Sequence, residues 1–377
     1  MKAVIAAYAR SPFHFANKGR LAPVRPDDLA SQVVRGLLAR TDLDPALLED
    51  VILGCAYPEA AQGNNLARIV GLLSGLPEQV GGMTVNRFCG SSMSAIHIAA
   101  AHIEAGLGDA YLCVGVESMT MVPQGGFNFS PNPWLREHTD AYISMGRTAE
   151  NVAKRYSIPR ADQEQMALES HRKATAAREQ GRLSDEIVGI DIGDGNRIAE
   201  DGCIRPTTSL EALAKLPPAF DENGVVTAGT SSPLTDGASA VLVTSEAFAA
   251  RYGLAPSARI RAMASAGCDP AVMGLGPIPA TQKALARAGL GADDLDVVEI
   301  NEAFASQALA CIGDLRLDPA TVNLDGGGMA IGHPLGATGA RITGKAAALL
   351  QRHHGRYALA TQCIGGGQGV ATILEAL

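Results

Sequence analysis

Aromatic residues are scarce in this chain of 377 residues: they make up 4% of it, and Trp134 is the one tryptophan. No apolar run approaches the roughly 18 residues that a membrane-spanning helix needs. Positive charge is in deficit, because 31 Lys and Arg face 39 Asp and Glu, for a formal net charge of −8. A surface of this sign repels phosphate backbones and anionic lipid, so we expect no nucleic-acid partner and no membrane insertion.

Paired cysteines are also missing. The seven cysteines are odd in number, widely scattered and contain no C-x-x-C pair, which argues against a disulfide framework and against a structural zinc site, and we expect no bound metal. The N-terminal apolar stretch ends at Arg10, too early for a signal sequence, and the C-terminal Leu-Glu-Ala-Leu is not a peroxisomal address. We therefore expect a cytoplasmic protein in which any special cysteine is a reactive thiol.

Hydrophobic residues, in contrast, form 47% of the chain, and 42 residues are glycine. This balance is typical of a compact globular enzyme. Apolar, β-branched runs alternate with Ala-rich stretches of helical period, and this alternation predicts an α/β protein with wound sheets. The predicted strands include residues 4–7, 51–53, 111–116, 297–300 and 357–361.

A modest internal repeat relates two parts of the chain. Aligning Gly90 with Gly336 also brings Tyr111 opposite Tyr357, since both intervals are 21 residues long. Each interval holds a helix start of small residues, an Ala-rich helix, a turn and then a strand. The repeat predicts two similar α/β halves.

The segment 119–233 departs from this pattern, since it holds the tryptophan, several proline clusters and a polar helical stretch over 160–180. We interpret it as an inserted, mostly helical and irregular layer that forms a wall of the ligand site; the alternative is a surface excursion that merely caps the sheet. The predicted organisation is an N-terminal half over 1–118 with a return segment over 234–256, an inserted loop domain over 119–233, and a C-terminal half over 257–377.

A cysteine stands at a predicted strand-to-helix elbow in the motif NRFCGSSM. The helix N-terminal dipole and free amides favour the thiolate of Cys89 at this place. The following glycine and serines leave room for a substrate, and the next amide is available as an oxyanion donor. Cys89 is therefore a candidate nucleophile, with a small buried cysteine as the alternative.

His333 lies in a glycine-rich loop, GGGMAIGHPLGATG, directly before a predicted helix. So many glycines indicate close approach of a ligand to the backbone or unusual backbone angles. An imidazole in this loop is suited to accept a proton from a thiol or to donate to a developing oxyanion. The alternative is a hydrogen-bonded loop histidine.

Two further motifs follow predicted strands. Cys363 begins CIGGGQG, and the repeat places its strand so that this cysteine and Cys89 lie at the same edge of the two-part sheet structure. Asn301 and Glu302 begin NEAFA. Asn301 is suited to hold a water or a carbonyl, whereas Glu302 is either an acid or a structural partner.

Two glycine-containing stretches look like nucleotide-binding loops, and neither fits. The run from Gly339 to Lys345 nearly spells a phosphate-binding loop, but Ala346 replaces the Ser or Thr that would hold magnesium, and the run reads as helix interior. The glycines of 365–369 have no βαβ unit and no ribose-binding acid about 20 residues later. We therefore exclude ATP and dinucleotide sites.

Taken together, NRFCGSSM, NEAFA, GGGMAIGHPLGATGAR and CIGGGQG resemble the thiolase family over essentially the whole chain. TAGTSSPLTDGASA and GCDPAVMGLGPIPA look most like the degradative 3-ketoacyl-CoA thiolases. The resemblance implies a thiolase-like fold, in which two similar βαβαβαββ halves stack as five α/β layers with an inserted loop domain over the active site. It also implies assembly as a homodimer or homotetramer.

The resemblance implies a role for each motif. Cys89 is the nucleophile that becomes acylated, and His333 activates it. His333 also lines a first oxyanion hole with a water held by Asn301. Cys363 is the acid and base, and the amides of Cys89 and Gly365 form a second oxyanion hole.

The implied reaction is CoA-dependent cleavage of 3-ketoacyl-CoA to acetyl-CoA and a shortened acyl-CoA in fatty-acid β-oxidation. Covalent catalysis through an acyl-cysteine implies ping-pong kinetics. Coenzyme A is a co-substrate, and no tightly bound cofactor is called for. Ser232, Met145 and Arg205 match positions that contact CoA in relatives, with a solvated loop charge as the alternative for Arg205. A hydratase/dehydrogenase subunit is a further partner that the family suggests.

Other functions remain open at this stage. An acetoacetyl-CoA thiolase running condensation uses the same residues, although Ser144 replaces the histidine that many of those enzymes carry before Met-Gly. A decarboxylating ketosynthase has a histidine or asparagine where this chain keeps Cys363. A non-catalytic CoA-binding protein is expected to lose Cys89, His333 or Cys363, and all three are present.

Overall fold

The computed structural model describes residues 2–193 and 195–377. Its strands form one ten-stranded mixed sheet in the order β10-β11-β12-β9-β1-β8-β5-β3-β4, with β2 paired to β8, and a separate ribbon of β6 and β7. Each predicted apolar run lies within a strand. The strands are β1 (Ala3–Arg10), β2 (His14–Phe15), β3 (Asp50–Gly54), β4 (Gly81–Val85), β5 (Ala110–Ser118), β6 (Ile190–Asp191), β7 (Arg197–Ile198), β8 (Thr235–Ser245), β9 (Ala258–Gly267), β10 (Val297–Ile300), β11 (Tyr357–Ile364) and β12 (Gln368–Glu375).

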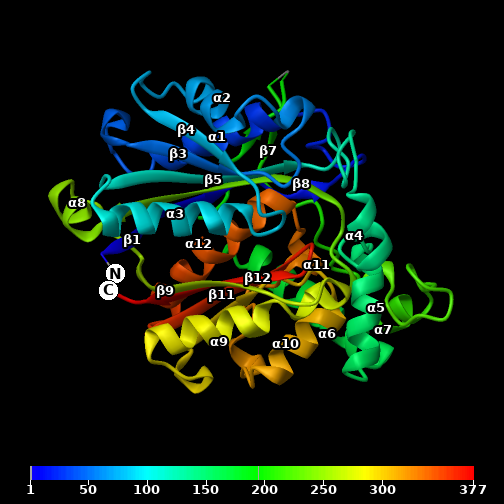
Figure 1. Ribbon diagram of the computed structural model, residues 1–377. Helices are drawn as coiled ribbons and strands as arrows, with labels where there is room; N and C mark the ends of the chain where they lie inside the picture. Colours follow the sequence, from blue (N-terminus) through cyan, green and yellow to red (C-terminus); the bar gives the residue numbers. More distant parts are fainter. Residues whose placement is uncertain (1, 194) are drawn as a thin grey trace.

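The helices and the two parts of the sheet stack in five layers (Figure 1). Central helices lie between the N-terminal strands and the C-terminal strands, and outer helices cover the other face of each part. The outer helices are α1 (Pro26–Leu38), α2 (Leu66–Leu73), α9 (Pro277–Ala288) and α10 (Ala305–Asp314), and the central ones are α3 (Ser91–Ala105) and α12 (Leu335–His353). Three buried apolar clusters fill the spaces between the layers. The predicted five-layer fold is confirmed.

The internal repeat corresponds to a repeat of topology. The strand order β3-β5-β8-β1 in the first half matches β10-β11-β12-β9 in the second. In both halves the first pair is parallel and the next two pairs are antiparallel. The halves meet through β1 and β9, where Val4 pairs with Arg259 and Ile5 with Ala258.

The two halves differ at one strand. The first half has β4 beside β3, whereas the matching place beside β10 holds a single parallel bridge between Val298 and Val322. The side chain of Asn323 makes the next contacts, since it accepts from the Ile300 amide at 3.0 Å and donates to the Ile300 carbonyl at 2.9 Å. The side chain of Asn323 thus makes the hydrogen bonds that a strand beside β10 would make. The second βαβαβαββ unit therefore has one strand fewer than predicted.

Close helix packing explains the glycines of α12. A Cβ added to Gly339 would lie 2.4 Å from the Met93 amide nitrogen in α3, and one added to Gly336 would lie 2.5 Å from the Val116 carbonyl oxygen in β5. Such distances leave no room for a side chain. The stretch that looked like a phosphate-binding loop therefore lies inside a central helix, as predicted.

The chain between β5 and β8 lies along one side of the layers (Figure 1). It contains α4 (Pro133–His138), α5 (Met145–Arg155), α6 (Arg160–Glu179), α7 (Leu210–Ala214) and the β6–β7 ribbon. The polar helical stretch predicted over 160–180 is α6. After β8, α8 (Glu246–Arg251) leads to β9, and α11 (Gly328–Ile331) precedes α12. The proposed domain boundaries at 118, 233 and 256 stay predictions.

Buried ion pairs fasten the inserted segment to the first strand and to α12. Arg10 is fully buried and donates to both carboxylate oxygens of Asp201, at 2.7 and 2.8 Å, and to Glu186 at 2.7 Å. Lys345 of α12 contacts Glu186 at 2.9 Å and Asp325 at 2.8 Å. Each charge of this buried cluster thus has a partner of opposite sign, which offsets the cost of its desolvation.

Across residues 2–193 and 195–377, no helix is long and apolar enough to cross a membrane.

Candidate active site

The loop that carries Cys89 joins β4 to α3 with a strained backbone. Phe88 has a φ of +43°, a left-handed conformation that few residues with side chains adopt. Local hydrogen bonds hold this turn: the Phe88 amide donates to Asn86 Oδ1 at 2.8 Å, and Ser91 Oγ donates to the Phe88 carbonyl at 2.6 Å. Gly90 follows, where a Cβ would lie 2.5 Å from Ile364 Cδ1. Glycine at position 90 therefore leaves room for the side chain of Ile364.

Cys89 is half-buried, and its sulfur faces the backbone of the C-terminal half. Burial raises the pKa of the Cys89 thiol to about 11, although a backbone hydrogen bond from Gly365 lowers it in part. The side chain of Gln362 also donates to the Cys89 carbonyl. Burial thus favours the protonated thiol of Cys89, whereas the helix N-terminus was expected to favour the thiolate. The attack on a substrate thus needs a base.

Cys363 lies at the end of β11 and is 1% exposed. Burial raises the pKa of its thiol well above the usual value, and the nearby Cys89 raises it further. The strand then turns through Gly366 and Gly367, both with φ near +80°. A Cβ on Gly367 would lie 2.3 Å from the Cys268 carbonyl oxygen, so the turn requires glycine. The structure brings Cys89, Gly365 and Cys363 together, as predicted.

His333 is buried just before α12, with both its backbone and its ring held. Its amide donates to Thr235 Oγ1 at 3.1 Å, and its Nδ1 lies 2.6 Å from Thr338 Oγ1. Because the Thr338 hydroxyl donates to the Pro334 carbonyl at 2.9 Å, it accepts from Nδ1–H. This assignment leaves Nε2 as the acceptor. Burial, assisted by the charge of Arg341, lowers the pKa of His333 to about 3, so the imidazole is a neutral base.

Asn301 contacts His333 from the end of β10. Its Nδ2 lies 3.3 Å from His333 Nε2 and 3.4 Å from Nδ1, and its backbone amide donates to the Thr361 carbonyl at 3.0 Å. Asn301 Oδ1 is buried without a hydrogen-bond partner among the described residues. A buried amide oxygen in this state is suited to a bound water or a substrate group. Asn301 and His333 thus lie together, and their role as a first oxyanion hole stays a prediction.

The neighbouring Glu302 is a structural partner. Its carboxylate accepts from the Ser170 hydroxyl at 2.6 Å, the Asn323 side-chain amide at 2.7 Å and the Met329 backbone amide at 3.2 Å. These bonds join α6, the residues before α11 and α11 itself. Of the two functions left open from sequence, the structural one therefore fits Glu302.

Replacing Glu302 by alanine should lower the free energy of unfolding by about 3 kcal/mol, because three buried donors lose their acceptor. Urea unfolding followed by circular dichroism measures this loss. The matched control is Glu211→Ala, which removes an exposed pair with Lys215 and should change the stability by less than about 0.5 kcal/mol. Equal effects of the two variants would contradict the structural role of Glu302.

Glu117 is a buried residue near the site that the sequence did not single out. It is fully buried at the end of β5, where it accepts from the backbone amides of Ala56 at 2.8 Å and Gly336 at 2.9 Å and from the side chain of Gln62 at 2.8 Å. Burial raises the pKa of Glu117, and these hydrogen bonds lower it in part. Glu117 thus holds the start of α12 against the loop after β3. An acid closing the apolar strand AYLCVGVES was the signal for it.

The three predicted CoA contacts separate into two places. The Ser232 amide donates to the Ala303 carbonyl at 2.9 Å, and Ala303 and Met145 pack in the apolar cluster that contains Cys363. Arg205 is exposed, and its guanidinium lies 5.1 Å from the centre of the Phe15 ring. Ser232 and Met145 thus lie beside the cysteines, whereas the contacts of Arg205 are with a different element.

Three histidines should make the fold sensitive to acid. Burial, assisted by Arg205, lowers the pKa of His171 to about 4, and burial lowers the pKa values of His97 and His333 to about 3. The pKa of a histidine in the unfolded chain is about 6.5. Below that pH the histidines of the unfolded chain bind protons, whereas the buried histidines of the folded chain do not. Stability is therefore full above that pH and falls as the pH decreases. We expect a loss of about 2 kcal/mol per histidine between pH 7 and pH 5 in urea titrations.

The matched variant for this test is His171→Asn, because asparagine keeps an acceptor for the Arg205 amide that donates to His171 Nδ1. It should remove the contribution of one histidine, about 2 kcal/mol of the loss between pH 7 and pH 5. An unchanged pH dependence in this variant would contradict the assignment.

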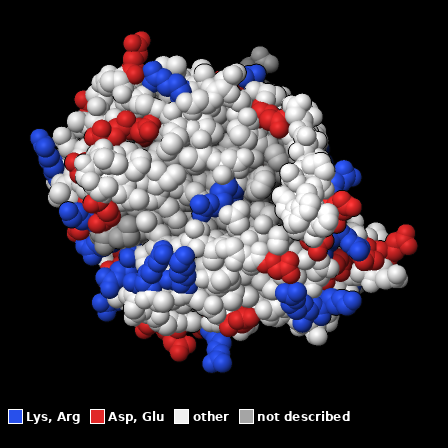
Figure 2. Space-filling view, viewed as in Figure 1, with Lys and Arg blue, Asp and Glu red and all other residues white. Residues whose placement is uncertain are grey.

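The surface of the face seen in Figure 2 is hollowed near its centre. A basic side chain lies within this hollow, its walls are otherwise mostly uncharged, and the other acidic and basic side chains lie toward the periphery. Such a surface suits a ligand with an apolar part.

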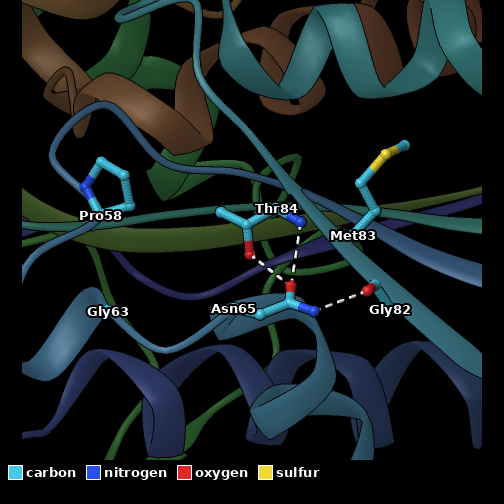
Figure 3. Close-up of a pocket in the computed structure, with 6 residues that line it drawn as sticks. All are labelled: Pro58, Gly63, Asn65, Gly82, Met83 and Thr84. Atoms are coloured by element: carbon cyan, nitrogen blue, oxygen red, sulfur yellow. Dashed lines mark hydrogen bonds between the residues drawn. The ribbon is translucent and has the colours of Figure 1, made fainter.

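A separate shallow hollow of about 410 Å³ lies beside the edge strand β4 (Figure 3). Asn65 is at its floor, accepting from the amide of Thr84 at 3.1 Å and its hydroxyl at 3.0 Å, and donating to the Gly82 carbonyl at 2.8 Å. Its lining has no nucleophilic thiol, imidazole or carboxylate: Pro58, Gly63, Asn65, Gly82, Met83 and Thr84. The hydrogen bonds of Asn65 satisfy part of the open edge of β4, which gives this hollow a structural explanation.

No group of three or more His, Cys, Asp or Glu side chains able to hold a metal ion occurs in the part of the chain that the structure describes.

Comparisons with known proteins agree with this fold. The model of the thiolase N-terminal domain matches residues 3–247, and that of the thiolase C-terminal domain matches residues 254–376. The chain is similar to thiolases over nearly its whole length, and this similarity identifies it as an acyltransferase. The chain belongs to the thiolase family.

Curated relatives and solved structures cover the whole chain. It is 50% identical to a 3-ketoacyl-CoA thiolase of Saccharophagus degradans over 99% of this chain and 97% of that protein. It is 48% identical to the 3-ketoacyl-CoA thiolase of Shewanella baltica strain OS155 over 99% of both chains. The crystal structure of human mitochondrial 3-ketoacyl-CoA thiolase superposes with a TM-score of 0.92 at 37% identity, covering 99% of this chain and 98% of that one. A structure of the same human enzyme in complex with CoA gives the same TM-score and identity, covering 100% and 98%.

Proposed function

We propose that this protein is a 3-ketoacyl-CoA thiolase, which cleaves a 3-ketoacyl-CoA with CoA to give acetyl-CoA and an acyl-CoA shortened by two carbons. The observation that carries the proposal is the meeting of Cys89, the Gly365 amide and Cys363 at one point between the two halves. Similarity to 3-ketoacyl-CoA thiolases over the full length supports it. Fatty-acid β-oxidation is the process that the names of these relatives support.

In the first half-reaction, the Cys89 sulfur attacks the keto carbon while His333 Nε2 accepts the thiol proton. The keto oxygen gains the negative charge, and the Asn301–His333 pair with a bound water stabilises it. The bond between the second and third substrate carbons then breaks. The acetyl-CoA carbanion takes the proton of Cys363, which leaves an acyl-Cys89 thioester and a Cys363 thiolate.

In the second half-reaction, the Cys363 thiolate takes the proton of an incoming CoA thiol. The CoA sulfur attacks the acyl carbon, and the amides of Cys89 and Gly365 stabilise the oxyanion. Collapse releases the shortened acyl-CoA, and the proton held by His333 returns to the Cys89 sulfur. Both thiols are regenerated, so the two steps balance and require no metal or redox group.

The structure of the human enzyme with CoA supports CoA as the co-substrate. We place CoA against Met145 and Ser232, which lie beside the cysteines, and keep Arg205 as a peripheral contact. A homodimer or homotetramer, a hydratase/dehydrogenase partner and a cytoplasmic location stay predictions.

The test is CoA-dependent cleavage of acetoacetyl-CoA beside a long-chain 3-ketoacyl-CoA, with kcat/KM measured for both. A higher kcat/KM for the long chain is expected. A preference for acetoacetyl-CoA would assign the protein to the short-chain thiolases that catalyse condensation, and cleavage of neither substrate would overturn the proposal.

A further inference from the structure

Two apolar side chains meet beside the reacting sulfur. A methyl group placed on Gly365 would lie 3.5 Å from the sulfur of Met145 and 3.8 Å from Cδ2 of Phe88. The amide of the same Gly365 faces the Cys89 sulfur. Met145 and Phe88 therefore border the space in which the thioester carbon must lie.

Phe88 is an unusual place for a large apolar ring. Its backbone is in the strained left-handed region, and its side chain is 38% exposed. Asn86 and Ser91 hold this conformation through hydrogen bonds to the Phe88 backbone. Strain of this kind persists at sites where the position of a side chain matters for function. The ring is held next to the nucleophile without being buried in a core.

Tyr57 continues the apolar surface from Phe88. The two ring centres lie 5.9 Å apart with a tilt of 47°. Tyr57 and Cys89 also pack against the same buried cluster, which contains Met119 and Leu335. Burial and the nearby Cys89 raise the pKa of the Tyr57 hydroxyl to about 12, so the side chain stays uncharged. Phe88 and Tyr57 together form an uncharged aromatic wall beside the sulfur.

The surface beyond this wall is also aromatic. The Phe127 amide donates to Glu59 Oε2 at 2.9 Å, which anchors the inserted segment two residues after Tyr57. Phe127 and Phe129 are 58% and 63% exposed. The Phe129 ring packs edge-on against the exposed Tyr142, with ring centres 5.9 Å apart. Exposed apolar side chains that gather in one patch often mark a binding surface.

We infer that Phe88 and Tyr57 bind the acyl chain of the substrate and set the preference of the enzyme for long chains. The inference rests on the proposed function. The CoA part and the acyl part of the substrate must leave the reacting carbon in different directions. Since Met145 lies on the side assigned to CoA, the aromatic wall is left for the acyl chain.

The experiment measures kcat/KM for acetoacetyl-CoA and for a long-chain 3-ketoacyl-CoA in the wild type and in Phe88→Ala. We expect the variant to lose about 30-fold for the long chain and less than about 3-fold for acetoacetyl-CoA, because only the long chain contacts the wall. Phe88→Leu, which keeps an apolar side chain, should recover most of the loss. Tyr57→Ala should also lower kcat/KM for the long chain, and it replaces Phe88→Ala as the test if that variant does not fold.

The matched control is Tyr252→Ala, since Tyr252 is 37% exposed and packs on Phe248 away from the cysteines. It should leave both substrates unchanged. An equal loss for both substrates in Phe88→Ala and in Tyr57→Ala would overturn the inference, because the rings would then only position Cys89. A wild type that cleaves neither substrate would instead overturn the proposed function, and this inference with it.

Discussion

Replacing Cys89 by alanine should lower the rate of thiolysis by about 10⁴-fold or more while the fold stays intact. The sulfur is the atom that forms the covalent intermediate, and no neighbouring group lies in the same position. Steady-state cleavage of a 3-ketoacyl-CoA measures the loss, and circular dichroism with urea unfolding checks the fold. Mass spectrometry without free CoA should show an acylated wild type and an unmodified variant.

Cys268→Ala is the matched control for this variant, because Cys268 is also a half-buried free cysteine. It should keep nearly the full rate and remain acylated by substrate. A Cys89→Ala protein that turns over at the wild-type rate would exclude the proposed mechanism.

Replacing Cys363 by alanine should slow both half-reactions by about 10² to 10⁴-fold, the usual contribution of a general acid or base. The same thiol donates a proton to the departing carbanion and later accepts one from CoA. Rapid mixing without free CoA measures the release of acetyl-CoA, and addition of CoA to the isolated acyl-enzyme measures the second step.

Cys311→Ala is the control for Cys363, since it removes another buried cysteine from the C-terminal half. It should lower stability without selectively slowing either step. If Cys363→Ala slows one half-reaction and leaves the other unchanged, the thiol does not serve as both acid and base.

These variants differ because burial acts on the two cysteines in different ways. Cys89 is half-buried with an amide directed at its sulfur, so a developing negative charge has a donor. Cys363 is almost fully buried, and both its burial and the nearby Cys89 raise its pKa. Its thiol therefore stays protonated and can donate the proton to the substrate carbanion. A nucleophile and an acid can thus be made from the same side chain by its surroundings.

Much of the fold followed from the sequence. The alternation of apolar runs with Ala-rich stretches predicted the α/β class, and the equal spacing from Gly90 to Tyr111 and from Gly336 to Tyr357 predicted the two halves. Both features are local, since strand and helix periods are written in consecutive residues. The reduced strand at Val322 was not predictable, because Asn323 makes its contacts with another part of the chain.

The short motifs of the sequence already indicate which side chains have reactive chemistry. Cys89, His333, Cys363 and Asn301 stand in short motifs with glycine or with strand ends, and the resemblance over four ordered motifs placed them in one family. The protonation states and hydrogen-bond partners of these groups depend on the tertiary structure. The protonated state of Cys89, the neutral His333, the structural place of Glu302 and the importance of Glu117 all arise from burial and from partners distant in the chain, since desolvation and long-range hydrogen bonds set pKa values.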